Sequence, residues 1–268
     1  MSRILFAAIF LFACLFSKGQ APFIPDEAKP FILPRYEALD YQTGDLNGDK
    51  KEDAILVLAM VGWDKVPGDR PADYDIALAI DRPFIILLRQ ANGKLKQALR
   101  NDSLILCVEC SGLGEPYEGT KTSSNGFVVS FVGASGEWRW ISEYKFVYKA
   151  LQKKWVLNSE KRSTYKYNDP ESTMKTVVIT EAELGPVTVE KFSTSFTYDE
   201  SKWKVKVAKT FFYDTPDLKS NPRKEYLVKD NLLAGMRHFT NFVEVSYDDG
   251  KGGYLHGFVL KKDLQKIQ

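Results

Sequence analysis

The chain has 268 residues, of which 44% are hydrophobic and 13% aromatic, so it can bury a substantial core and is not disordered throughout. Lysine and arginine number 37 against 35 aspartate and glutamate, and no stretch is strongly basic. This balance argues against nucleic acid or an anionic membrane surface as a partner. We expect one large or two modest domains.

The first 19 residues have the pattern of a secretory signal. Arg3 precedes the apolar run Ile4–Ala13, which is too short to span a membrane. Ser17 and Gly19 are small residues at the −3 and −1 positions of a cleavage site before Gln20. We therefore predict export to the periplasm or the cell surface, with no membrane span.

Cys14 offers an alternative to soluble export. The residues Leu11-Phe12-Ala13-Cys14 resemble a lipoprotein box, in which the cysteine carries a lipid. However, Phe12 is large for its position, and Leu15-Phe16 is hydrophobic where a tether would be polar. Soluble export is the favoured interpretation, and lipidation at Cys14 or an uncleaved anchor are the alternatives.

The segment 44–58, GDLNGDKKEDAILVL, places oxygen-bearing side chains at alternate positions ahead of an apolar run. Side chains at this spacing can converge on one hard cation, and the β-rich run anchors the loop as a strand. We therefore predict a calcium site. Its predicted ligands are the side chains of Asp45, Asn47, Asp49 and Asp53 and the backbone carbonyl of Lys51.

This spacing resembles the single-loop calcium motif of FG-GAP and VCBS-type repeats, D-x-[DN]-x-D-G-x-x-D. Lys50 replaces the glycine of the sixth position, which needs a tight, often left-handed turn and costs another residue about 1 kcal/mol. Lys50 and Lys51 also bring positive charge, so we expect a dissociation constant on the order of 10⁻⁴ M or weaker. The alternative is an acidic surface turn that starts a strand.

Two cysteines follow the signal segment, Cys107 and Cys110, as C-V-E-C. In an exported protein such a pair predicts a disulfide. The spacing also fits a thiol redox site, but that type opens a helix after a strand, whereas a glycine-rich loop follows the predicted strand Ser103–Cys107. Zinc is a third alternative and needs two further ligands, while His238 and His256 lie far downstream.

The middle of the chain has strand periodicity. Asn92-Gly93 predicts a hairpin after the apolar run Phe84–Leu88, and the polar stretch Gly62–Arg82 predicts a long loop. Thr180 and Glu183 form a capping box for one helical turn. Further predicted strands are Lys94–Leu99, Ser103–Cys107, Gly126–Val132, Trp155–Leu157, Val187–Tyr198 and Trp203–Ala208.

The segment Trp138–Tyr148 alternates between aromatic and charged residues, as a half-buried antiparallel strand does. We interpret the aromatic face as a core row. A glycan-binding platform that uses Trp138 or Trp140 is the alternative. The aromatic face holds Trp138, Trp140, Tyr144, Phe146 and Tyr148.

The stretch Asn101–Tyr148 resembles a family of exported bacterial proteins that carry one FG-GAP-like loop. The matching residues are N-D-S-L-I-L-C-x-x-C-x-G, E-P-Y-E-G and G-E-W-R-W. The resemblance implies export and a β-rich fold and assigns no reaction. A multi-blade propeller is not predicted, because the chain has no second D-x-[DN]-x-D loop.

The segment Thr210–Leu264 resembles bacterial Src-homology-3-type domains. That family often carries tryptophan where this chain has Phe258, so a tryptophan-dependent ligand groove is not implied. The resemblance implies a small barrel of short strands that binds peptidoglycan or an envelope protein. It rests on Phe211-Phe212-Tyr213, Pro216-Asp217, Arg223–Lys229, Phe242–Tyr247 and Gly257–Val259.

These observations predict an all-β protein with a signal peptide (1–19), a proline-rich leader (20–34), an antiparallel β domain with the calcium-type hairpin loop (35–205) and a C-terminal Src-homology-3-like barrel (206–268). The predicted function is non-catalytic binding or scaffolding in a bacterial envelope, with calcium as a stabilising ion. The alternatives are an envelope thiol oxidoreductase using Cys107 and Cys110, or a glycan-binding protein.

Overall fold

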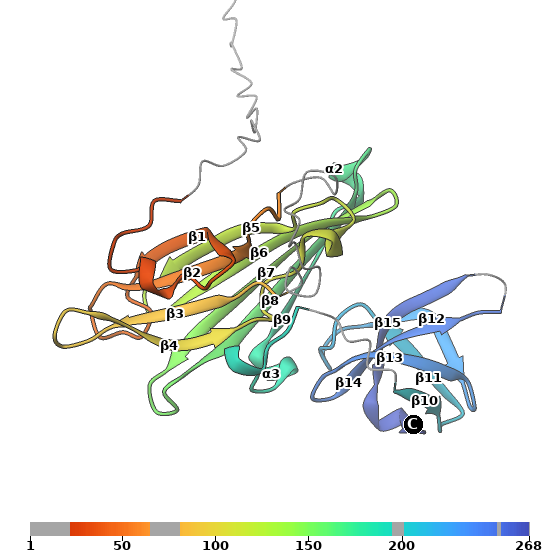
Figure 1. Cartoon of the computed structure of the whole chain (residues 1–268). Helices are drawn as coiled ribbons and strands as arrows, with labels where there is room; N and C mark the ends of the chain where they lie inside the picture. The colour runs from red at the N-terminus through yellow and green to blue at the C-terminus, as the bar shows by residue number, and fades with distance from the viewer. Residues whose placement is uncertain (1–21, 65–80, 195–200, 251–252, 268) are drawn as a thin grey trace, which may run out of the picture.

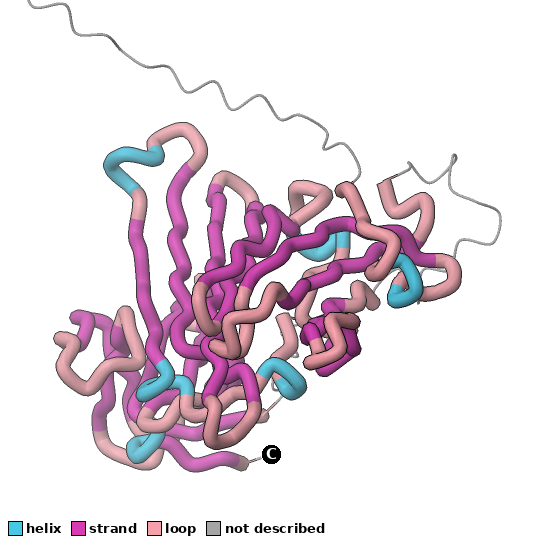
Figure 2. Tube along the Cα trace, turned by 90° about the vertical axis from the view of Figure 1, so that its left-hand side faces the viewer, coloured by secondary structure: helices cyan, strands magenta, loops and turns pink. Residues whose placement is uncertain are grey.

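The computed structural model describes residues 22–64, 81–194, 201–250 and 253–267. Over these residues the chain is all-β, as predicted, with three antiparallel sheets and only short helices at strand ends and in loops (Figures 1 and 2). Within these ranges no helix is long and apolar enough to cross a membrane. The secretory signal, Cys14 and most of the predicted loop Gly62–Arg82 lie outside the described residues.

The first sheet is a meander in which each strand pairs with the next one along the chain. Every residue of β2 is buried, because both faces of this interior strand are covered. The predicted Asn92-Gly93 turn joins β3 to β4, with Gly93 at φ 79°. The strands are β1 (Tyr36–Gly44), β2 (Asp53–Met60), β3 (Phe84–Arg89) and β4 (Leu95–Asn101).

The proline-rich segment before β1 covers the outer face of this sheet. It turns through η1 (Lys29–Phe31) and buries Ala28 completely against β2 and β3. We expected a leader separate from the domain, but its apolar side chains complete a core, because β2 needs apolar cover on its second face. The packed side chains of this segment are Ile24, Ala28, Phe31, Ile32 and Leu33.

The second sheet is also a meander, and β7 and β8 span 12 and 13 residues. β7 is the predicted aromatic strand. β8 continues well beyond the predicted Trp155–Leu157, because it pairs with β7 from Lys154 to Lys166. α2 (Pro170–Thr173) connects β8 to β9. The strands are β5 (Tyr117–Ser123), β6 (Gly126–Ser135), β7 (Trp138–Lys149), β8 (Lys154–Lys166) and β9 (Lys175–Thr180).

The first two sheets pack face to face as a sandwich around the main core. At one edge the carboxylate of Asp40 in β1 accepts hydrogen bonds from the Tyr117 hydroxyl at 2.6 Å and from the Thr120 amide at 3.0 Å, both in β5. Burial and the Asp40 charge raise the pKa of Tyr117, so the phenol stays a donor. The core includes Ile55, Val57, Phe84, Ile86, Phe127, Val129, Phe131, Tyr144 and Phe146.

The third sheet is formed by seven short strands in the order β12-β11-β15-β14-β13-β10-β16. β10 (Lys202–Val205) lies between β13 and β16, and its Trp203 and Val205 are in this sheet's core. The third sheet thus begins at Lys202, ahead of the predicted boundary between residues 205 and 206. Its other strands are β11 (Lys209–Tyr213), β12 (Pro222–Val228), β13 (Leu232–His238), β14 (Phe242–Asp248), β15 (Tyr254–Leu260) and β16 (Leu264–Lys266), with η5 (Lys261–Asp263) before β16.

Two predicted strands are not seen among the described residues. Ser103–Cys107 belongs to no strand, and the described part of Val187–Tyr198 contains η4 (Val189–Lys191) instead. The Asn101 side-chain amide donates hydrogen bonds to the carbonyls of Val189 and Phe192, at 2.5 and 2.8 Å. A side chain thus satisfies backbone groups that a strand would have paired.

The third sheet contacts the end of the second through an apolar cluster beside β9 and α3 (Glu181–Leu184) (Figure 1). α3 has the predicted capping box, in which the Glu183 carboxylate accepts the Thr180 amide at 2.8 Å. The Thr240 amide donates to the Glu183 carbonyl at 2.9 Å, which links the third sheet to this helix. The cluster is formed by Ile179, Phe239, Phe242 and Phe258.

Candidate metal centre

The loop between β1 and β2 brings together the three carboxylates that the sequence predicts as ligands. Asp45, Asp49 and Asp53 each present an oxygen atom, and these oxygens all lie within 4.8 Å of one another. Oxygens bound to one calcium ion at about 2.4 Å are separated by no more than about 4.8 Å. The spacing therefore fits a shared calcium ion.

The turn at the sixth position of the loop has the left-handed conformation that the sequence pattern requires. Lys50 has φ 65°, and Gly48 before it has φ 80°. The two oxygens of the Asp45 side chain accept the amides of Gly48 at 2.7 Å and Lys50 at 2.9 Å. The loop thus makes a left-handed turn at a lysine, at a cost in backbone strain.

Asn47 and Lys51 stabilise the rest of the turn. The Asn47 side-chain carbonyl accepts the Asp49 amide at 2.9 Å. The Lys51 ammonium lies 3.0 Å from the second carboxylate oxygen of Asp49, and this hydrogen bond lowers the pKa of Asp49. A cation in the loop therefore competes with Lys51 for Asp49, which favours weak binding.

Asp53 is completely buried at the start of β2. Its carboxylate accepts the amide of Leu46 at 3.1 Å and the amide of Arg89 in β3 at 2.9 Å. Burial raises the pKa of Asp53, these amides lower it, and the charges of Asp49 and Asp45 raise it further. The carboxylates repel one another, and a divalent cation would offset that repulsion.

The loop is connected to the sandwich core through Leu46. The Leu46 side chain is fully buried in the main core, and its carbonyl accepts the Trp155 indole N–H at 2.8 Å. The Asn125 amide donates to the Asp45 carbonyl at 2.9 Å from the turn between β5 and β6. An ion that fixed this loop would therefore also fix contacts between the two sheets.

Cys107 and Cys110 form a disulfide with a Cα–Cα distance of 5.2 Å. Cys107 directly precedes η3 (Val108–Ser111), and Cys110 lies within it. This 3-10 helix is a single turn that ends at Gly112, which has φ 72°. The geometry differs from a redox site that opens a long helix. Neither His238, which packs edge-on against Trp203, nor His256, on β15, joins the cysteines in a metal-binding cluster of the described residues.

The aromatic row on β7 divides into three environments. Tyr144 and Phe146 are buried in the sandwich core, as the core interpretation predicts. Trp140 lines a cavity. Trp138 is 38% exposed, with the Lys166 ammonium 5.4 Å from its ring.

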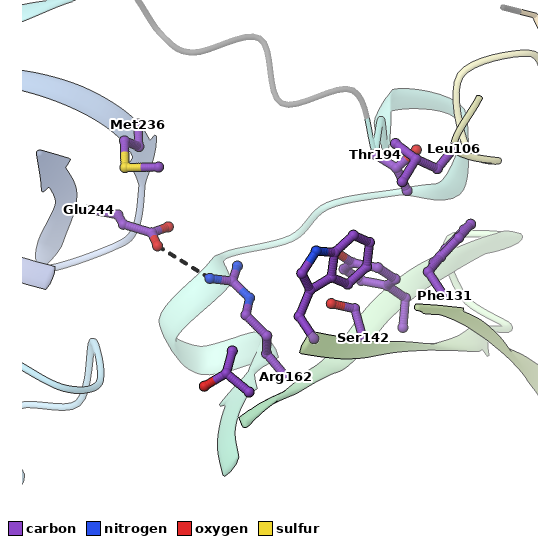
Figure 3. Close-up of a pocket in the computed structure, with 10 residues that line it drawn as sticks. Leu106, Phe131, Ser142, Arg162, Thr194, Met236 and Glu244 are labelled. Carbon is purple, nitrogen blue, oxygen red and sulfur yellow. Dashed lines mark hydrogen bonds and ion pairs between the residues drawn. The ribbon is translucent and has the colours of Figure 1, made fainter. Parts of the chain in front are cut away.

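The cavity is a feature that the sequence did not reveal. It has a volume of about 280 Å³ and lies where the second sheet meets the third, with Ser142 and Arg162 on one side and Met236 and Glu244 on the other (Figure 3). Glu160 and Arg162 are two residues apart on β8, so strand periodicity in the sequence indicates that they lie on the same face. This periodicity does not indicate which distant strands cover that face.

Comparison of the chain with family models, with curated proteins and with solved structures gives no match. The resemblances to calcium-loop repeats and to Src-homology-3-type domains therefore remain predictions. The case for a function rests on the geometry of the described residues.

Proposed function

We propose that the chain is a non-catalytic binding or scaffolding protein of a bacterial envelope whose β-sandwich is stabilised by one calcium ion in the loop 45–53. The observation that carries this proposal is the convergence of Asp45, Asp49 and Asp53 within 4.8 Å around the left-handed turn at Lys50. Calcium accepts oxygen ligands in varied geometries, whereas magnesium demands a tight octahedron, so this set of oxygens suits calcium better.

The role of the ion would be structural, because of where the loop lies. Asp53 accepts the amides of Leu46 and Arg89, and Leu46 is part of the core between the two sheets. A bound cation lowers the free energy of the folded state without affecting the unfolded chain to the same degree. We expect the exported protein to gain stability in a calcium-containing compartment.

Thermal unfolding of the purified chain tests the calcium site. At free calcium of 100 times the dissociation constant, mass action adds about 2.7 kcal/mol, which raises Tm by about 5–10 °C for a protein of this size. Magnesium at the same concentration should raise Tm much less. Asp45→Asn and Asp49→Asn should each abolish the rise.

The matched control is Asp26→Asn, which removes an exposed aspartate paired with Lys29 outside the loop. This variant should keep the full calcium-dependent rise. If 10 mM calcium leaves Tm of the unmodified chain unchanged, the loop is an acidic turn and the calcium proposal is wrong.

The binding role is assigned to the C-terminal sheet, with peptidoglycan or an envelope protein as its partner. The support is the sequence resemblance of Thr210–Leu264 together with the short antiparallel strands of the third sheet. Co-sedimentation of the purified chain with isolated peptidoglycan tests the first partner. A chain that stays in the supernatant at micromolar concentration excludes peptidoglycan and leaves the protein partner as the proposal.

A further inference from the structure

The inner face of the second sheet extends beyond the part that the first sheet covers. β7 and β8 span 12 and 13 residues, whereas β3 and β4 span 6 and 7. Tyr144 and Phe146 on this face are buried in the sandwich core, and Trp140, further along the same face, is half-buried against that core. Trp140 and Tyr144 both line the cavity. An apolar surface continues out of the core into a space bounded on its other side by the third sheet (Figure 3).

The charges at this cavity are already paired with one another. Arg162 donates to Glu160 at 2.8 Å and to Glu244 at 3.3 Å. Arg237 donates to the second oxygen of the same two carboxylates, each at 2.7 Å. Two arginines and two glutamates thus form a closed ring, named here the ion-pair ring, with no net charge. A charged ligand would have to displace one of these ion pairs in order to pair with an arginine or a glutamate. An uncharged ligand would leave all of them in place.

The remaining lining is apolar, with a few hydroxyl groups. Leu106, Phe131, Trp140 and Met236 form the apolar walls, and Ser142 and Thr164 provide hydroxyls. Burial raises the pKa of the Tyr144 phenol, so this group stays uncharged as well. An apolar cavity of about 150 Å³ holds benzene, so about 280 Å³ has room for a second ring.

We propose that the cavity between the second and third sheets binds a small, uncharged aromatic molecule of one or two rings. Its ring packs against Trp140 and Phe131 under Met236, and one polar group of the ligand reaches the hydroxyl of Ser142 or Thr164. The ligand contacts both halves of the interface, so binding strengthens the contact between them. This inference uses the cavity alone and does not depend on the calcium site.

Titration of the full chain with three indoles tests this inference. Indole is uncharged, indole-3-acetate adds a carboxylate, and tryptamine adds an ammonium. The readout is the ¹³C-methyl NMR signal of Met236, with Met60 and Met174, which do not line the cavity, as internal references. We expect indole to shift the Met236 signal saturably and to bind at least about tenfold more tightly than either charged analogue.

Two variants on β8 provide the matched controls. Thr164→Phe fills the cavity, because Thr164 lies opposite Trp140 in the strand register, and it should weaken indole binding at least about tenfold. Lys161→Phe adds the same ring on the opposite face of the strand, where Lys161 pairs with Glu143, and should leave binding unchanged.

Three outcomes would overturn the proposal. No saturable shift of the Met236 signal with indole would mean that the cavity takes no aromatic ligand. Tighter binding of indole-3-acetate would mean that the arginines of the ion-pair ring recruit an anion. Equal weakening of indole binding by Thr164→Phe and Lys161→Phe would place the ligand elsewhere.

Discussion

At the scale of single residues, Lys50 determines how well the proposed metal loop can work. Its φ of 65° is a left-handed conformation that costs a lysine about 1 kcal/mol more than a glycine. It also adds a positive charge beside three carboxylates. The backbone strain of Lys50 therefore opposes folding of the empty loop, and its charge opposes binding of a cation.

Lys50→Gly should stabilise the calcium-free chain by up to about 1 kcal/mol and should tighten calcium binding severalfold. The first effect comes from relieved strain and the second from the removed charge. Urea unfolding and isothermal calorimetry measure the two effects separately.

Lys153→Gly is the control, because Lys153 has φ 52° in a separate turn, between β7 and β8, and is not part of the loop 45–53. It should give a similar gain in stability and leave calcium affinity unchanged. If Lys50→Gly leaves calcium affinity unchanged as well, Lys50 does not act on the site through its charge.

At the scale of elements, β10 shows how a short strand changes the domain boundary. The sequence around it is rich in lysine, which looks like a junction between domains. In the structure, Trp203 and Val205 point into the core of the third sheet, and the Trp203 indole N–H donates to the Ser201 hydroxyl at 2.8 Å. The lysines of β10 flank buried residues, as strand alternation allows.

A fragment of residues 201–268 should fold by itself, and a fragment of 210–268 should not. Without β10, β13 and β16 lose the strand between them, and the core loses Trp203. Amide dispersion in NMR spectra and a cooperative melt at low concentration distinguish the two fragments. Equal folding of both would show that β10 is dispensable for the third sheet.

At the scale of the whole molecule, the ion-pair ring joins the two halves of the chain. Glu160 and Arg162 come from β8, and Arg237 and Glu244 come from β13 and β14. Glu160 is only 1% exposed in its side chain. Burial alone would raise the pKa of Glu160, but the attraction of Arg237 and Arg162 outweighs it and lowers the pKa below the ordinary value of 4.5.

Glu160→Gln should destabilise the protein by up to about 3 kcal/mol at neutral pH, because it leaves two half-buried arginines with Glu244 as their shared carboxylate. A carboxylate with a lowered pKa contributes stability above its unfolded pKa and loses it as the pH falls through the folded value. The difference between Glu160→Gln and the unmodified chain should therefore persist down to about pH 4.5 and shrink below it. Urea unfolding at a series of pH values measures this difference.

Glu143→Gln provides the comparison, since Glu143 pairs with Lys161 in an exposed contact of the same sheet. Such a pair contributes about 0–1 kcal/mol, so this variant should have little effect. A small effect of Glu160→Gln, similar to that of Glu143→Gln, would mean that the ion-pair ring adds nothing to the contact between the halves.

The sequence by itself determined the features that depend on neighbouring residues. Alternation indicated the aromatic strand β7, Asn92-Gly93 indicated the hairpin, and Asp45, Asp49 and Asp53 were identified as a converging set. Each of these needs only local backbone geometry. The left-handed turn at Lys50 was likewise a property of the loop's own spacing.

Only the tertiary structure decided what covers each face and which strands share a sheet. It placed Ala28 and its neighbours on the outer face of β2, moved β10 into the third sheet, and left Ser103–Cys107 without a strand partner. It also brought Glu160 within 2.7 Å of Arg237 and formed the cavity beside them. These contacts join residues far apart in the chain, and a periodic pattern shows that a face is apolar or charged without showing what it packs against.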